Sequence, residues 1–326
     1  MSQGLLTTAV GSYPKPDYLQ KARNQVAQGK MDPRELHELE NKATAHWIKL
    51  QDDIGLDILV DGEMYRGDMV TYFSENMEGF EISGLVRSYG NRYYRKPICV
   101  GPVGMKSTIT VDWWRYAQSL TQKPVKGMLT GPYTMVDWSF NEYYPTREAF
   151  VMDMARLVHE EAVALEKAGA KYIQIDEPAV STRPEEMALA SRALAVVTKG
   201  LQAFTITHMC YGDFANVYDQ LVRLPVNNLD LEMTNSNYDL LELIRQRGLP
   251  QDKSISMGVV DSHSHRVESV EEIKRGIKLG LEVLPPERLF IDPDCGLKTR
   301  QEDETVGKLR NMVQAVREVK QELGIK

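Results

Sequence analysis

The stretch KYIQIDEPAV (residues 171–180) decides the predicted fold, because it is a short strand-like run that ends in acidic residues. Short runs rich in Val, Ile and Leu on both faces are typical of buried parallel strands. Seven further runs of this kind lie at residues 5–10, 57–61, 125–130, 203–208, 228–232, 255–261 and 288–292. Helical sequence follows each run, so the pattern predicts an α/β fold of the (β/α)8, or TIM, barrel type.

The predicted helices carry start and stop signals. Asp32 and Pro33 suit an N-cap and a first helical position, and Gly55 is a C-terminal stop. A second long run starts at Thr146 and is closed by Gly169. Further helices are predicted at residues 184–199, 213–221, 238–247, 269–279 and 302–322. A doubly wound open sheet is the alternative, but eight strands and the lack of a GxGxxG turn after the first favour the barrel.

One segment, residues 62–124, separates the second and third strands by far more than one helix. It contains the aromatic-rich stretches SYGNRYYRKP (88–97) and VDWWRY (111–116). We interpret it as an insertion with a β-hairpin near the barrel mouth, and a peripheral flap is the alternative. Because α/β barrels often exceed the usual length of a domain, residues 1–326 are predicted to form a single domain.

Composition narrows the function classes. A net charge of −7 argues against non-specific binding of nucleic acid, which needs a basic face. The chain has no apolar run of about 18 residues and no secretory leader, so neither a membrane span nor export is expected. Its three cysteines are too few for a disulfide framework. We therefore expect a cytoplasmic monomer with free thiols.

The strongest chemical signal is THMC (207–210), at the end of a predicted strand. His208 and Cys210 are two residues apart and point the same way. Glu232 ends the next strand in LDLEMT, and Cys295 follows the last strand in IDPDCG. Because strand ends of a barrel surround one mouth, these four residues form a candidate tetrahedral Zn²⁺ site. The alternative is that the cysteines only pack in the core.

Zinc with two thiolate ligands suits one kind of chemistry. It binds a substrate thiol and lowers its pKa, which makes the sulfur a nucleophile for alkylation. Glu232 is the hardest of the four ligands and the one expected to give way to substrate.

Eight motifs, in the same order, resemble the catalytic half of the cobalamin-independent methionine synthase family. They are TTAVGSYPKP (7–16), VDGEMYRGDMVTYF (60–73), MLTGPYTMVDWSF (128–140), QIDEPAV (174–180), THMCYGDF (207–214), LDLEMTNSNYDLLE (229–242), GVVDSHSHRVESVEEI (258–273) and DPDCGLKTR (292–300). The resemblance implies a (β/α)8 barrel that forms L-methionine from L-homocysteine. It also implies that zinc is held by His208, Cys210, Glu232 and Cys295.

The same resemblance implies further site residues. The amino-acid end of homocysteine is assigned to Val10, Gly11, Ser12, Glu63 and Asp176. Carboxylates there would neutralise the substrate ammonium, and a hydroxyl would hold its carboxylate. His263 matches the proton-donating histidine of the family, and His265 is a competing candidate.

The motifs that correspond to the methyl-donor site depart from the pattern of the family. Arg92, Tyr93 and Trp138 occupy donor-binding positions, but Tyr93 replaces a smaller residue and Thr182 replaces an expected glutamate. The second barrel of the longer, folate-dependent members is absent. These departures lead us to expect methylcobalamin, or a methylated corrinoid protein, as the co-substrate and partner. Methyltetrahydrofolate is the alternative donor.

Two other functions compete with this one. A corrinoid-dependent methyltransferase of the coenzyme M type would also use an HxC zinc site, but a sulfonate thiol has no ammonium for Glu63 and Asp176 to bind. A structural zinc protein would hold its metal in a closed cage of ligands close in sequence. Here the ligands lie on separate predicted strands, which favours an active site.

Overall fold

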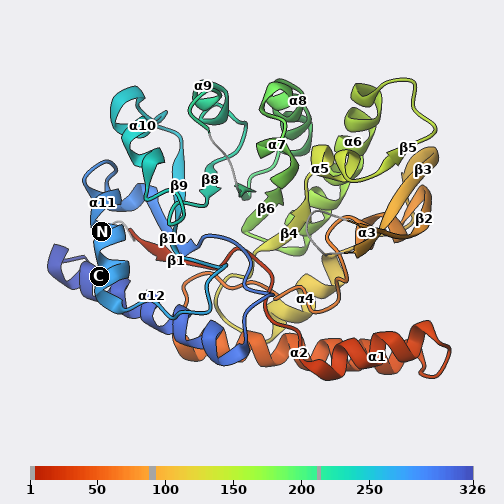
Figure 1. The fold of residues 1–326 in the computed structure, drawn as a ribbon, viewed down its shortest axis with the longest axis horizontal. Coiled ribbons are helices and arrows are strands. Elements are labelled where there is room, and N and C mark those ends of the chain that lie inside the picture. The colour runs from red at the N-terminus through yellow and green to blue at the C-terminus, as the bar shows by residue number, and fades with distance from the viewer. Residues whose placement is uncertain (1–3, 88–92, 211–213, 326) are drawn as a thin grey trace.

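The computed structural model describes residues 4–87, 93–210 and 214–325. Its centre is a curled, seven-stranded sheet in which all neighbours are parallel, in the order β1-β10-β9-β8-β7-β6-β4 (Figure 1). The strands are β1 (Leu6–Thr7), β4 (Gly127–Thr130), β6 (Tyr172–Asp176), β7 (Phe204–Met209), β8 (Asn228–Leu231), β9 (Ser254–Val260) and β10 (Leu289–Pro293). Each of the seven overlaps a predicted run.

The second predicted strand is present as isolated bridges and closes the gap between β1 and β4. The amide of Ile58 donates to the Thr7 carbonyl at 3.0 Å. On the other side, Leu59 donates to the Pro124 carbonyl at 2.9 Å and accepts from the amide of Lys126 at 2.8 Å. Backbone hydrogen bonds therefore run around the whole ring, and the predicted (β/α)8 barrel is confirmed.

The helices surround the sheet, and their ends follow the predicted signals. Asp32 accepts a hydrogen bond from the Arg34 amide at 2.8 Å, and Gly55 adopts a left-handed φ of 96°. The helices are α1 (Asp17–Ala27), α2 (Pro33–Ile54), α3 (Thr71–Glu75), α4 (Val111–Ser119), α5 (Pro132–Asp137), α6 (Arg147–Ala168), α7 (Pro178–Ser181), α8 (Met187–Val197), α9 (Tyr218–Leu221), α10 (Asp239–Arg247), α11 (Val270–Leu281) and α12 (Glu302–Leu323), with 3-10 turns at Pro184–Glu186 and Pro286–Arg288. Helix α1 was not among the predicted helices, and residue 213 of the predicted helix at 213–221 lies outside the described residues.

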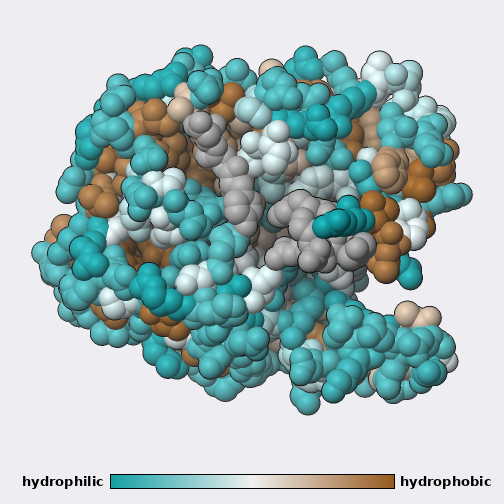
Figure 2. All heavy atoms as spheres, viewed as in Figure 1, coloured by the Kyte–Doolittle hydropathy of each residue, from teal (hydrophilic) through white to brown (hydrophobic). Residues whose placement is uncertain are grey.

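The insertion contains the predicted hairpin, formed by β2 (Met77–Arg87) and β3 (Tyr93–Met105), which pair antiparallel. The short strand β5 (Phe140–Asn141) adds to β3 and belongs to the loop after β4. Because that loop follows the carboxyl end of a barrel strand, the hairpin stands at the mouth of the barrel. Apolar atoms gather over β2 and β3 in Figure 2, whereas α1 and α12 are mostly hydrophilic.

The main core lies between the sheet and the helices, but the inside of the barrel is polar. Lys126, Gln174, Asp230 and Asp292 are each at most 1% exposed. Buried polar side chains are costly unless they find partners, so this interior layer indicates a functional constraint. Within the described part of the chain, no helix combines the length and apolarity needed to cross a membrane.

Candidate metal centre and substrate site

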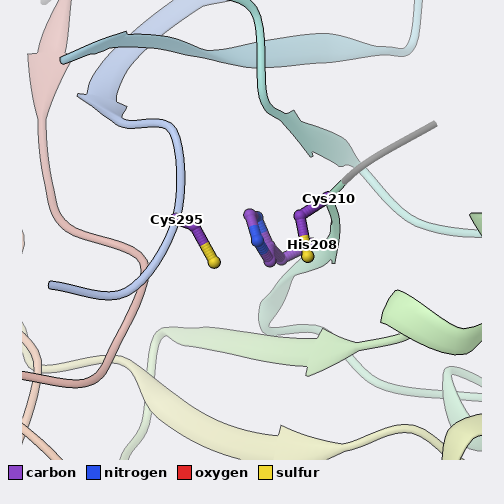
Figure 3. A group of neighbouring side chains, drawn as sticks. All are labelled: His208, Cys210 and Cys295. Carbon is purple, nitrogen blue, oxygen red and sulfur yellow. The ribbon is translucent and has the colours of Figure 1, made fainter. Parts of the chain in front are cut away.

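Three of the four predicted metal ligands meet at the mouth of the barrel. His208 is the fifth of six residues in β7, Cys210 directly follows the strand, and Cys295 lies in the loop after β10. One ligand atom from each lies within 4.8 Å of the others, and Figure 3 shows the three side chains converging. The alternation of β7 and the adjacency of the strand ends therefore produce the predicted cluster.

The fourth predicted ligand, Glu232, lies outside this close group of described residues. Its carboxylate accepts a hydrogen bond from the side-chain amide of Asn235 and lies 3.9 Å from Nε2 of His263. The side chain is only 9% exposed. Glu232 therefore contacts Asn235 and faces His263 in this structure, and its role as a metal ligand stays a prediction.

His208 is held from behind by a residue that sequence reasoning missed. Its Nδ1 lies 2.9 Å from Oδ1 of Asp230, and the two residues are direct neighbours across β7 and β8. Nε2 of His208 is buried and has no hydrogen-bond partner of normal geometry in the part of the chain that the structure describes, and its ring contacts both thiols. The sequence carried one signal for this residue. Asp230 lies two positions before the predicted ligand Glu232, and residues i and i+2 of a strand share a face.

The electrostatics of the cluster favour a metal-binding thiolate. Hydrogen bonding from Cys210, with His208 nearby, holds the pKa of Cys295 well below its usual range. The same contact raises the pKa of Cys210. Burial lowers the pKa of His208, but Asp230 and the two sulfurs raise it well above the ordinary value. One nitrogen and two sulfurs are the donors that Zn²⁺ accepts readily.

The predicted substrate loops adjoin this cluster. Glu63 has a left-handed φ of 58°, and its amide donates to Oδ1 of Asp61 at 2.9 Å. A Cβ on Gly11 would come within 3.0 Å of the Glu63 carboxylate, so the backbone of Gly11 lies close against that side chain. A Cβ on Gly296 would likewise fall closer than 3.0 Å to the hydroxyl of Ser12. The loop after β1 thus lies against Glu63 on one side and the Cys295 loop on the other.

Asp176 links the amino-acid positions to the metal positions. It is the register neighbour of His208 across β6 and β7. The side-chain amide of Gln174 donates to Asp176 Oδ1 and to the Val10 carbonyl, both at 2.8 Å. Burial raises the pKa of Asp176 to about 7. The five predicted homocysteine positions therefore surround one region next to His208.

The two candidate histidines differ in position. His263 is 39% exposed and faces Glu232, whereas His265 is 70% exposed and pairs with Glu304 at 2.9 Å. The geometry favours His263 for a proton at the site, although its role stays a prediction.

The predicted donor positions are only partly visible. Trp138 ends α5 and is half-buried. Arg92 lies outside the described residues, and Tyr93 begins β3 with a side chain that also lies outside them. The Thr182 hydroxyl donates to the Ala179 carbonyl at 2.9 Å. The donor-binding roles stay predictions.

Asp294 is a second residue that sequence reasoning missed. Its carboxylate accepts hydrogen bonds from the amides of Met233 at 3.0 Å and Thr234 at 3.1 Å. It therefore ties the loop that carries Cys295 to the loop that carries Glu232. The only sign of this role in the sequence is that Asp294 directly precedes the predicted ligand Cys295.

Comparison with known proteins identifies the family. The family model described as "Cobalamin-independent synthase, Catalytic domain" matches residues 5–318. The chain belongs to the cobalamin-independent methionine synthase family. A methionine synthase of Saccharolobus solfataricus is 38% identical over 320 residues, which cover 98% of this chain and 96% of that protein. The predicted enzyme, a homocysteine methyltransferase, agrees with this family.

Longer proteins and a solved structure show the same relationship. A 5-methyltetrahydropteroyltriglutamate–homocysteine methyltransferase of Mycolicibacterium paratuberculosis is 40% identical over 328 residues, 97% of this chain but 43% of that protein. The structure of a B12-independent methionine synthase from Shewanella sp. W3-18-1, in complex with selenomethionine, matches with a TM-score of 0.86 and 27% identity. That match covers 98% of this chain and 99% of the other.

The expected methyl donor was wrong. Methylcobalamin as co-substrate, and a corrinoid protein as partner, conflict with a cobalamin-independent family and with the B12-independent structural relative. The replacement at Thr182 changes one polar side chain on an exposed turn, which does not create a surface for a corrin ring.

Proposed function

We propose that residues 1–326 form one zinc-binding barrel domain that transfers a methyl group from a methyltetrahydropteroylglutamate to the sulfur of L-homocysteine. The observation that carries this proposal is the convergence of His208, Cys210 and Cys295 within 4.8 Å, in the mouth of a barrel of this family. The register pairing of His208 with Asp176 supports it, because that pairing joins the thiol-binding and amino-acid-binding positions.

The residues present fit a zinc ion. Nε2 of His208 is a buried nitrogen that finds no normal hydrogen-bond partner within residues 4–87, 93–210 and 214–325, and two sulfurs lie beside it. Glu232 directly follows β8, the strand that pairs with β7, and would complete the set after a change of side-chain conformation. When bound, Zn²⁺ would lower the pKa of a substrate thiol and so supply a thiolate at neutral pH.

The substrate site would recognise an amino acid at both ends. Glu63 and Asp176 would pair with the ammonium group once Asp176 is ionised. The Ser12 hydroxyl and the backbone of its loop would hold the carboxylate. These contacts would orient the sulfur toward Cys210 and Cys295, and they disfavour a thiol that lacks an ammonium group.

The donor side of the proposal rests on the mycobacterial relative and on Trp138. Trp138 is half-buried and offers an aromatic face to a pterin ring. Methyl transfer from nitrogen leaves an amine anion unless that nitrogen is protonated, and a histidine can supply the proton near neutral pH. His263 faces the site beside Glu232 and would hold this proton.

Methionine formation by the zinc-loaded protein tests the proposal. Homocysteine is supplied with methyltetrahydropteroyl triglutamate, the monoglutamate or methylcobalamin in separate reactions, and Cys295→Ser serves as the control. We expect turnover with the pterin donors and none with the variant. A zinc-loaded wild type that makes methionine only from methylcobalamin, or from none of the three, would overturn the proposal.

A further inference from the structure

The contact behind His208 has a geometry that bears on metal binding. Nδ1 of His208 and Oδ1 of Asp230 are 2.9 Å apart, with exposures of 3% for His208 and 1% for Asp230. The pairing is built into the sheet, since the two residues are register neighbours on β7 and β8. Neither side chain has room to turn toward solvent, so the contact is a fixed part of the barrel interior.

The chemistry of this contact decides which imidazole nitrogen is available. An ionised carboxylate only accepts hydrogen bonds, so Nδ1 must donate. With Nδ1 donating to Asp230, Nε2 is the ring nitrogen left for a metal, whose binding releases any proton that it carries. Among the residues that the structure describes, Nε2 has no hydrogen-bond partner of normal geometry, and its ring contacts Cys210 and Cys295.

A second carboxyl group, that of Asp292, contacts Asp230 inside the barrel. Asp292 is fully buried and interacts with Asp230 through their carboxyl groups. Its two oxygens and Oδ2 of Asp230 have no donor among the described residues. Burial, followed by the charge of Asp230, raises the pKa of Asp292 well above its ordinary value, and Lys126 only partly opposes this. Asp292 therefore packs against the carboxyl group of Asp230 on the side away from His208 and restricts its movement.

We propose that Asp230 is a positioning residue that holds the His208 ring through Nδ1, so that Nε2 is turned toward the two thiols and is the nitrogen offered to the metal. This inference rests on the proposed function, because it assumes that His208 is a zinc ligand. It goes further by naming a residue that touches neither metal nor substrate. Loss of a hydrogen-bonding partner behind a metal-bound histidine typically weakens metal affinity by roughly 10- to 100-fold.

The test measures zinc affinity directly, by competition with a chromogenic chelator on the full-length protein. Asp230→Ala removes the acceptor and its charge, and we expect affinity to fall by roughly 10- to 100-fold. Asp230→Asn keeps an oxygen that can accept from Nδ1, so we expect a smaller loss. The visible spectrum of the cobalt-substituted protein provides a second readout, since a reoriented imidazole changes the ligand field.

Asn228→Ala is the matched control. Asn228 is buried on the same strand and face as Asp230, but it pairs with Ser254 at 2.9 Å and with Ser256 at 2.9 Å. We expect this variant to keep wild-type zinc affinity. Thermal unfolding of each metal-free variant separates loss of fold from loss of metal.

The outcomes are distinguishable. Weaker zinc binding in both Asp230 variants, larger for alanine, with an unchanged control supports the inference. Wild-type affinity in a folded Asp230→Ala protein, or an equal loss in the Asn228 control, overturns it while the proposed function stands. A wild-type protein that retains no zinc would overturn the proposed function, and this inference with it.

Discussion

Substitution of Gly296 by alanine should weaken homocysteine binding without unfolding the protein. A Cβ at this position would lie closer than 3.0 Å to the hydroxyl of Ser12, a separation that real Cβ atoms essentially never show. The next nearest atoms of Ser12 are 3.4 Å and 3.6 Å away, which is tolerable. Gly296 is not among the described glycines with positive φ, so alanine fits its backbone. The hydroxyl alone must move.

The magnitude follows from what the hydroxyl is proposed to do. Rotating a serine hydroxyl out of its preferred position costs about 1 kcal/mol or less of stability. Losing its hydrogen bond to a substrate carboxylate costs about 1.5–3 kcal/mol of binding. At 1.4 kcal/mol per tenfold change, the affinity for homocysteine should fall about 10- to 100-fold.

A double-mutant cycle with Ser12→Ala makes this prediction specific. Ser12→Ala should weaken homocysteine binding by a similar factor, because it removes the same hydrogen bond. Gly296→Ala added to Ser12→Ala should then have little further effect, since no hydroxyl remains to displace. Isothermal titration with homocysteine on the zinc-loaded proteins measures all four corners. Additive losses, or full affinity in Gly296→Ala, would refute the reasoning.

Three further predictions concern other parts of the site. Cys210→Ser and Cys295→Ser should each lose zinc on dialysis, as metal analysis will show, and full zinc content in both would contradict the proposed centre. Burial raises the pKa of Asp176 to about 7, against an ordinary value of about 3.9. The contribution of Asp176 to the free energy of unfolding is therefore fully present below about pH 4 and is lost as the pH rises through about 7. Over the same range the carboxyl group ionises, so its affinity for the substrate ammonium group increases. Methionine, which has no thiol, should therefore bind more tightly at pH 8 than at pH 6, and Asp176→Asn should remove this pH dependence. Trp138→Ala should raise the KM for the pterin donor roughly 5- to 10-fold through lost stacking and leave the KM for homocysteine unchanged; equal effects on both would argue against its role.

Local signals in the sequence located the strands of the barrel and most of its longer helices, but not α1, α3, α4, α5 or α7. Asp32 and Gly55 delimit α2 because an N-cap acceptor and a left-handed stop act over a few residues. The second predicted strand, residues 57–61, was located correctly but is irregular. The side chain of Asp57 accepts a hydrogen bond from the backbone amide of Thr7 at 2.8 Å, in place of a backbone carbonyl. Such competition between side chain and backbone has no periodic signature.

The sequence by itself determined the barrel, the family and the candidate ligands, since strand alternation places His208 and Cys210 on one face and parallel strands bring their carboxyl ends together. Only the tertiary structure decided that Asp230 lies behind His208, that Glu232 turns toward Asn235, and that Gly296 makes room for Ser12. These contacts join residues that are far apart in sequence or depend on side-chain rotamers. They are set by register and by close packing, which no local pattern of residues encodes.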